Sequence, residues 1–263
     1  MSSAIGFMIR LQVRSRLAYR GAFLLNRLAQ IIAYASAYSA IWVLIRKFDT
    51  LAGWNWPELA LLLSFQLLAY ALGASLSFTQ MRDLEDKVRS GSFDTLLVKP
   101  FSPWAYLVFS GLNLGYLGHI VLAVGMLGWS LGALPIEWTL LRVLYAVSSL
   151  ASAAMVVASL LTMIGACAFV LARSRYLYGI FFGLWELTRY PLNLFPVPLQ
   201  WLLLTLLPLG FMNYVPVSYL LGKPTVVVGE LGGLLSPLVG PLLVGLAAWQ
   251  WRFCLRRYQG AGG

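Results

Sequence analysis

The densest group of chemically active side chains lies in one short stretch, Met81–Pro100. The chain has 19 lysines and arginines and 9 aspartates and glutamates, and eight of these charged residues fall within this stretch. Side chains of both signs can form ion pairs with a complementary surface, and such pairs orient two partners. The stretch is therefore a candidate for protein binding. Its charged residues are Arg82, Asp83, Glu85, Asp86, Lys87, Arg89, Asp94 and Lys99.

The other residues that could do chemistry do not form a catalytic or metal-binding set. His119 is the single histidine, and Cys167 and Cys254 lie in or beside apolar runs without the spacing of a zinc, haem or disulfide site. No H-E-x-x-H occurs, so an intramembrane metalloenzyme is disfavoured. The sequence G-x-x-x-x-G-K-[ST] is also missing, because the one Gly-Lys pair, Gly222–Lys223, is followed by proline. We expect that this chain binds no metal, cofactor or ATP of its own.

The charged stretch also carries apolar residues in a pattern that predicts a helix and then a turn. Met81, Leu84 and Val88 share one helical face, and Gly91 would end the helix. After it, Phe93, Leu96, Leu97 and Val98 would enter a loop in water, up to Pro100. Apolar side chains beside mixed charge indicate a docking element for another protein. The alternative is a solvated connector between two helices.

The composition places most of the chain in lipid. Hydrophobic residues make up 60% of its 263 residues, charged residues make up 11%, and the mean hydropathy is +0.79. A soluble domain would have about 25% charged residues. The net charge of +10 lies beside apolar runs, so the cytoplasmic leaflet and the orientation of loops explain it better than nucleic acid does.

Six membrane crossings are predicted, since about 20 apolar residues span a bilayer. Between the fifth and the sixth, the proline-framed segment Leu199–Gly222 would dip into the outer leaflet and return. The six are Leu28–Ile45, Leu59–Phe78, Ala105–Leu131, Val143–Leu171, Tyr176–Phe195 and Leu231–Trp251.

The distribution of basic residues orients these crossings. With a cytoplasmic N-terminus, thirteen of the 19 basic residues lie on the inner side and five on the outer side, which agrees with the positive-inside rule. Both termini would then be cytoplasmic. Residues 1–20, with four arginines, would form an interfacial helix. Ala33-Tyr34-Ala35 resembles a signal-peptide cleavage site, but the apolar run continues through Ile45, which favours an uncleaved helix.

Polar residues inside crossings are candidates for a substrate pathway. Asn113 and His119 lie in the third crossing, and Glu186 and Arg189 lie in the fifth. Beside Glu186, the rings of Phe181, Phe182 and Trp185 could attract a cationic amphiphile. The simpler alternatives are a hydrogen bond between helices for His119 and an interfacial ion pair for Glu186 and Arg189.

Two motifs resemble a known family. The stretch RSGSFDTLLVKP is similar to a loop of permease subunits in the type-2 exporter class of ABC transporters, and LLPLGFMNYVPVSYLLG is similar to a late proline-containing segment of the same subunits. The first match rests on Arg89, Gly91, Phe93, Asp94, Leu96, Leu97, Lys99 and Pro100, and the second on Pro208, Phe211, Tyr214 and Pro216.

The resemblance implies an all-α integral membrane protein, a single permease domain over residues 1–263 in the inner membrane. It implies a cytosolic coupling loop at 79–103, which would dock ATPase subunits through the first motif together with Leu84 and Asp86. It also implies a re-entrant segment at 190–224, framed by Pro191 and the second motif. A second permease subunit would complete the pathway for a hydrophobic or amphiphilic substrate, with ATP and Mg²⁺ bound by the ATPases. The alternative is an ion-coupled secondary transporter, although it would need an internal repeat and buried ionisable residues near the midplane.

Overall fold

The computed structural model describes residues 20–100, 102–110, 113–171, 173–223, 225 and 227–260. The interfacial helix expected at 1–20 lies outside these residues, except for Arg20, where the first described helix begins.

Long apolar helices dominate the fold. Within the described residues, four helices are long and apolar enough to cross a membrane: Leu24–Phe48, Trp56–Arg89, Leu140–Phe169 and Gly229–Leu255. They contain α2 (Arg20–Phe48), α3 (Trp56–Arg82), α8 (Leu140–Ala166) and α12 (Gly229–Leu255). These helices confirm the first, second, fourth and sixth apolar helices expected from the sequence, and they make the chain a multi-pass membrane protein.

Local sequence signals set the starts of two of these helices. At α3, the side chain of Asn55 accepts a hydrogen bond from the Glu58 amide, and the Glu58 carboxylate accepts one from the Asn55 amide. This reciprocal pair satisfies two amides that have no backbone acceptor within the helix. At α8, the Thr139 hydroxyl accepts a hydrogen bond from the Arg142 amide at 3.3 Å.

The expectation of one continuous helix over Ala105–Leu131 is wrong. The segment divides into α6 (Pro103–Ser110), a 3-10 turn (Leu114–Tyr116) and α7 (Leu117–Ala133). Asn113 lies at the break, where its amide donates to the Ser75 carbonyl at 2.9 Å and its side chain donates to the Thr79 hydroxyl at 3.1 Å. These bonds to α3 take the place of helical bonds, which is how asparagine competes with a helix.

The expected fifth helix, Tyr176–Phe195, is also wrong as a single element. Helix α9 (Tyr176–Leu187) ends near Thr188, whose hydroxyl bonds back to the Trp185 carbonyl at 2.7 Å, and Pro191 cannot continue it. Short helices follow: Leu192–Leu194, α10 (Val197–Trp201), a π-helical turn (Leu202–Leu206), Leu209–Met212 and α11 (Tyr214–Leu220).

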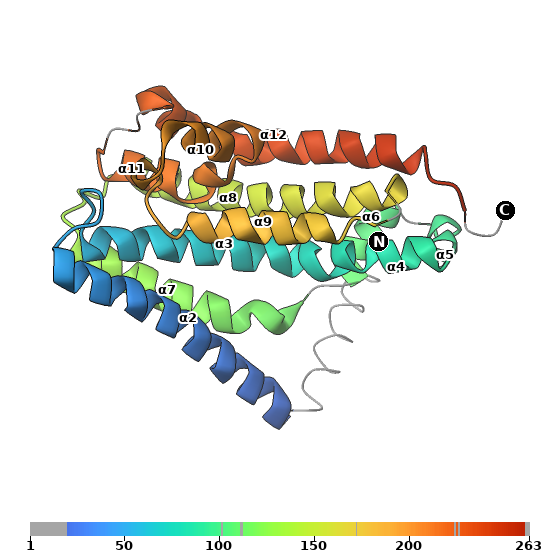
Figure 1. Cartoon of the computed structure of the whole chain (residues 1–263), viewed down its shortest axis with the longest axis horizontal. Coiled ribbons are helices and arrows are strands. Elements are labelled where there is room, and N and C mark those ends of the chain that lie inside the picture. Colours follow the sequence, from blue (N-terminus) through green and yellow to red (C-terminus); the bar gives the residue numbers. More distant parts are fainter. Residues whose placement is uncertain are drawn as a thin grey trace.

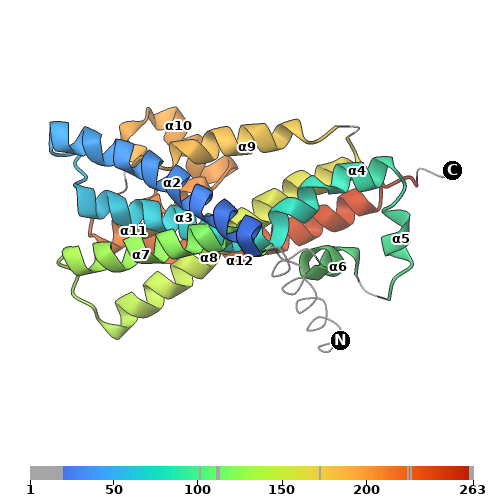
Figure 2. The same cartoon turned by 90° about the horizontal axis from the view of Figure 1, so that it is seen from below.

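The helices α2, α3, α7, α8, α9 and α12 run along the long axis of the molecule, and successive ones run in opposite directions (Figure 1). The short helices α4 (Leu84–Arg89), α5 (Asp94–Leu97) and α6 gather at one end, together with the end of α12. The short helices α10 and α11 lie at the opposite end. The view in Figure 2 shows the same division, so we call these the α4 end and the α11 end of the bundle.

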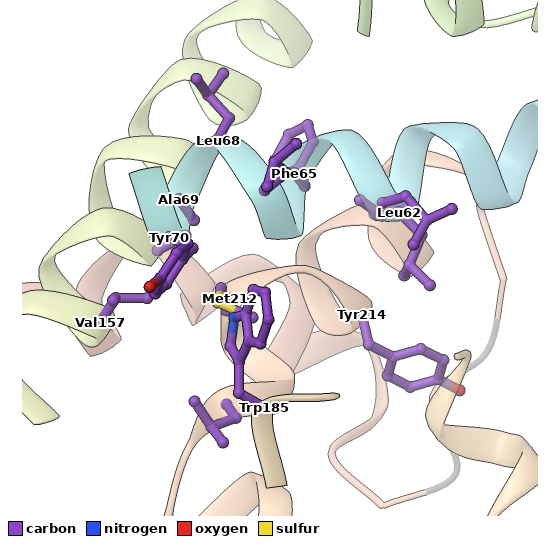
Figure 3. Packing of buried hydrophobic residues seen from close by; sticks show 14 of the residues in the cluster. Leu62, Phe65, Leu68, Ala69, Tyr70, Val157, Trp185, Met212 and Tyr214 are labelled. Carbon is purple, nitrogen blue, oxygen red and sulfur yellow. The ribbon is translucent and has the colours of Figure 1, made fainter. Parts of the chain in front are cut away.

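The core lies around α3, which is buried along most of its length, whereas α12 turns most of its surface outward. Figure 3 shows how residues from several helices meet there: Tyr70 of α3 lies beside Trp185 of α9, and Met212 and Tyr214 approach from the short helices of the α11 end. The ring centroids of Tyr70 and Trp185 are 4.7 Å apart. The exposed apolar residues of α12 suit contact with lipid.

Helix α12 contains Pro237 and Pro241, and hydroxyls of α8 bond to its backbone close to each of them. Pro237 has no amide hydrogen for the Gly233 carbonyl, which instead accepts a hydrogen bond from the Tyr145 hydroxyl of α8 at 2.6 Å. Just before Pro241, the Ser152 hydroxyl of α8 accepts from the Gly240 amide at 2.8 Å and donates to the Ser236 carbonyl at 2.9 Å. Gly240 permits this approach, since a Cβ there would lie 2.3 Å from the Ser152 carbonyl oxygen.

Candidate functional site

The α4 end is built from the segment Leu84–Pro100, which we call the charged segment. Helix α4 continues α3 almost without interruption, and it ends where Gly91 adopts a positive φ of 71°. Glycine adopts this conformation without the steric cost that other residues have. The helix and its glycine stop were both expected from the sequence, and both are confirmed.

The inner face of the charged segment is packed against the bundle. Phe93 is 0% exposed, and its ring centroid lies 4.9 Å from that of Phe169 and 5.2 Å from that of Tyr258. Leu84 and Leu96 belong to the same buried cluster. The expectation that Phe93 and Leu96 project into water is therefore wrong: the loop folds back, with the Phe93 amide bonded to the Lys87 carbonyl at 3.0 Å.

The outer side of the charged segment has two apolar side chains that are exposed. Leu97 is 46% exposed and Val98 is 85% exposed, and Asp86, Arg89 and Pro100 are exposed as well. Lys99 is held in place by the ring of Tyr106, whose centroid lies 3.8 Å from its ammonium nitrogen. Of the apolar residues expected to form a docking element, Leu97 and Val98 are thus the ones that can reach another protein.

Asp94 joins the charged segment to the end of the chain. The Tyr258 hydroxyl donates a hydrogen bond to Asp94 Oδ1 at 2.9 Å. Burial, together with the neighbouring carboxylate, raises the pKa of the Tyr258 hydroxyl above its usual value, so the tyrosine stays protonated and remains a donor.

A second carboxylate, Glu85, joins the charged segment to the loop before α9. Its Oε2 atom accepts hydrogen bonds from the amides of Ser174 at 2.6 Å and Arg175 at 2.8 Å. The neighbouring Asp86 forms an ion pair with the Arg175 guanidinium. No local sequence pattern marks Glu85 as such a link, because its partners are about ninety residues away in the chain.

The structure brings some of the predicted pathway residues together: His119, Phe182 and Trp185 pack around the ring of Tyr70, whereas Glu186 and Asn113 lie apart from them. His119 is buried among the rings of Tyr34, Tyr70 and Tyr116, with centroids 4.6, 6.2 and 5.3 Å from its own. Phe181, Phe182 and Trp185 belong to the same buried core. By contrast, Glu186 is half exposed and paired with Arg189 at 2.8 Å, as the simpler alternative had it, and Asn113 lies at the break before α7.

One amide side chain, Asn213, holds the short helices of the α11 end in the core, and a second, Gln66 of α3, holds the end of α9 beside them. Asn213 donates to the Thr188 carbonyl at 2.7 Å, and Gln66 of α3 donates to the Trp185 carbonyl at 3.0 Å and to the Thr188 hydroxyl at 2.9 Å. The neighbouring Tyr214 is buried, with its ring centroid 5.8 Å from that of Trp54. The aromatic residue of the second motif therefore packs inward.

Two apolar cavities lie elsewhere. One of about 510 Å³ opens between α3, α6, α8 and α12, with Trp104, Trp251 and Arg252 in its lining. The other, of about 590 Å³, lies between α2 and α7 and is lined by Trp42, Trp56 and Trp129. Neither contains a residue of the predicted pathway. Among the described residues, no group of three or more His, Cys, Asp or Glu side chains could hold a metal ion.

Comparison with known proteins adds one finding to this geometry. A family model described as "ABC-2 family transporter protein" matches residues 31–262. No curated protein and no solved structure matches the chain significantly. The matched range covers the long helices, the charged segment and the short helices of the α11 end.

Proposed function

The chain belongs to the ABC-2 transporter family, and from this premise we propose that it is the permease subunit of an ATP-driven exporter. It forms half of a pathway, and a second permease subunit, identical or different, forms the other half. ATP and Mg²⁺ bind to separate ATPase subunits, and this chain catalyses no reaction itself. The substrate is hydrophobic or amphiphilic.

The observation that carries the proposal is the outer side of the charged segment. Its inner side is fixed by Phe93, Leu84 and Leu96, so the segment is a folded part of the bundle rather than a loose connector. Leu97 and Val98 nevertheless remain open, beside charges of both signs. An apolar group rimmed by charge is the usual composition of a protein-binding surface. The ATPase subunits would dock here.

We propose that the chain lies in the inner membrane with its α4 end facing the cytoplasm. Arg82, Lys87 and Arg89 lie at this end, as does the end of α12 with Arg252, Arg256 and Arg257. Clusters of arginine and lysine beside apolar helices face the cytoplasm. The charged segment is then where an ATPase can reach it, with six crossings and both termini inside.

Replacement of Leu97 and Val98 by glutamate tests the docking surface. We expect a tagged Leu97→Glu/Val98→Glu chain, expressed in its native cells, to recover at least about tenfold less vanadate-sensitive ATPase than the wild type does, because burying two such side chains contributes about 1.5–3 kcal/mol each. Both residues face away from the core, so the thermal stability of the purified permease should change little.

The matched control is Leu97→Met/Val98→Ile, which keeps the surface apolar and should recover as much ATPase as the wild type. Wild-type amounts of ATPase with the glutamate variant would show that the charged segment is only a solvated connector.

A further inference from the structure

Glu85 makes an unusual set of contacts for a carboxylate on a short helix. Its side chain is only 5% exposed, although most of α4 faces outward. One oxygen, Oε2, accepts three hydrogen bonds: from the Ser174 amide at 2.6 Å, the Arg175 amide at 2.8 Å and the Ser174 hydroxyl at 3.2 Å. The carboxylate is thus bound to the backbone that leads directly into α9.

These contacts act as an N-terminal cap that α9 receives from another part of the chain. The first amides of a helix have no partner within it, and the start of a helix carries partial positive charge. The residue at the capping position of α9, Arg175, makes no capping bond with its own side chain. Glu85 supplies both the acceptor and the negative charge, and hydrogen bonds to an ionised acceptor are stronger than neutral ones.

Apart from the hydrogen bond between Asp94 and Tyr258, which leads to the segment after α12 and not to α9, the other links between the charged segment and the bundle are less directional. The ion pair between Asp86 and Arg175 is solvent-exposed, and such pairs contribute little. The contacts of Phe93, Leu84 and Leu96 are apolar, and apolar contacts do not fix a direction. Hydrogen bonds to two successive amides require a defined distance and angle. Glu85 is therefore the contact that fixes where α9 begins relative to α4.

The far end of α9 is fixed just as firmly. Gln66 bonds to the Trp185 carbonyl and the Thr188 hydroxyl, and Asn213 bonds to the Thr188 carbonyl. With 12 residues, α9 is a rigid rod of about 18 Å. It joins the charged segment at one end to the short helices of the α11 end at the other.

We propose that Glu85 is a positioning residue that makes the charged segment and α9 move together when the ATPase subunits move. The proposal rests on the proposed function, since the ATPase supplies the displacement. A shift of α4 is passed through the Glu85 cap to the start of α9, and through the rod to the segment held by Asn213. Substitution of Glu85 should then leave the docking of the ATPase subunits intact and weaken the transmission of their movement to α9.

The test uses the complete complex of permease and ATPase subunits in lipid nanodiscs. An environment-sensitive bimane label is placed on Tyr176→Cys, an exposed position at the start of α9, in a chain with Cys167→Ala and Cys254→Ala. Two quantities are measured: the ATPase recovered with the permease, and the fluorescence change on adding MgATP and vanadate.

For Glu85→Gln we expect recovered ATPase within about twofold of the wild type and a fluorescence change at least about threefold smaller, because the amide offers a weaker, uncharged acceptor. The matched control is Asp83→Asn, since Asp83 is an exposed carboxylate two residues away that makes no capping hydrogen bond. It should behave as the wild type in both measurements.

A full fluorescence change in Glu85→Gln, or no change in the wild-type complex, would overturn the proposal. If Glu85→Gln yields no folded complex, Glu85→Asp decides: it keeps the charge but is one methylene shorter, so it cannot reproduce the bonds to both amides. A response equal to the wild type would count against Glu85 as the transmitting contact. Lack of any ATPase with the wild-type permease would refute the proposed function, and this inference with it.

Discussion

The charged segment Leu84–Pro100 and the segment Leu192–Leu220 are both built from short helices between longer ones, yet they differ in how far they are buried. The charged segment buries one side and leaves Leu97 and Val98 open. The segment at the α11 end buries Leu192, Leu203, Leu209, Met212, Val215 and Val217 completely. The first is a surface attached to the bundle, and the second is part of its core. Burial, rather than helix length, therefore distinguishes the proposed docking element from the structural segment.

The polar groups that hold the two segments also differ. Carboxylates hold the charged segment, through Glu85 and Asp94, whereas the neutral amide of Asn213 holds the α11 segment. An ionised group is costly away from water, and a hydrogen-bonded amide much less so. The type of linking group thus follows the depth at which each segment lies.

The largest expected effect tests whether the inner side of the charged segment belongs to the core. Phe93→Ala should lower the free energy of unfolding by about 3–5 kcal/mol, because it leaves a cavity among Phe169, Trp251 and Tyr258. Leu97→Ala, on the outer side of the same segment, should change it by no more than about 0.5 kcal/mol. Thermal unfolding of the two purified variants in detergent gives the difference, and equal losses of stability would erase the distinction between the two sides.

An intermediate effect is expected from the α11 segment. Asn213→Ala should lower the free energy of unfolding by about 1–3 kcal/mol, because it leaves the Thr188 carbonyl without its buried donor. Asn193→Ala is the control: this asparagine is exposed and donates to the Ala52 carbonyl at 2.9 Å, where water can replace it. Equal losses of stability for the two variants in the same unfolding assay would show that Asn213 does not hold the α11 segment in the core.

The smallest effect on stability is expected for two cysteine substitutions that test which end of the bundle faces the cytoplasm. Thr50→Cys, in the turn between α2 and α3, and Gln259→Cys, after α12, are exposed positions that should leave the fold unchanged. In a background with Cys167→Ala and Cys254→Ala, an impermeant thiol reagent added to intact cells should label residue 50 and spare residue 259. Labelling at 259 alone would invert the orientation and place the charged segment outside the cell.

The sequence predicts the parts of this fold that depend on neighbouring residues. Four long apolar runs became long helices, and Gly91 ended α4, because these features follow from local composition and backbone freedom. The breaks at Asn113 and Thr188 were missed, since each depends on bonds to a distant helix: Ser75 and Thr79 for the first, Gln66 for the second.

The candidate site shows the same limit. The charged segment was predicted to be a binding element from its charge, its apolar residues and its resemblance to a permease loop. The direction of Phe93 could not be predicted, because its partners Phe169 and Tyr258 come from other parts of the chain. Glu85 was overlooked for the same reason: a capping carboxylate looks like any surface glutamate until the helix that it caps is located.

The prolines of α12 have a consequence for how the protein is assembled during synthesis. Helix α12 leaves the ribosome after α8, and its Gly233 and Ser236 carbonyls accept hydrogen bonds from hydroxyls of α8. An unsatisfied carbonyl in hydrocarbon costs several kcal/mol. Helix α12 is therefore poorly suited to enter lipid alone. We expect α8 to be inserted first, so that its hydroxyls can bond to α12 as α12 enters the membrane. If α8 is not in place when α12 is inserted, these carbonyls lack their donors, and α12 is exposed to the proteases that remove misassembled membrane proteins.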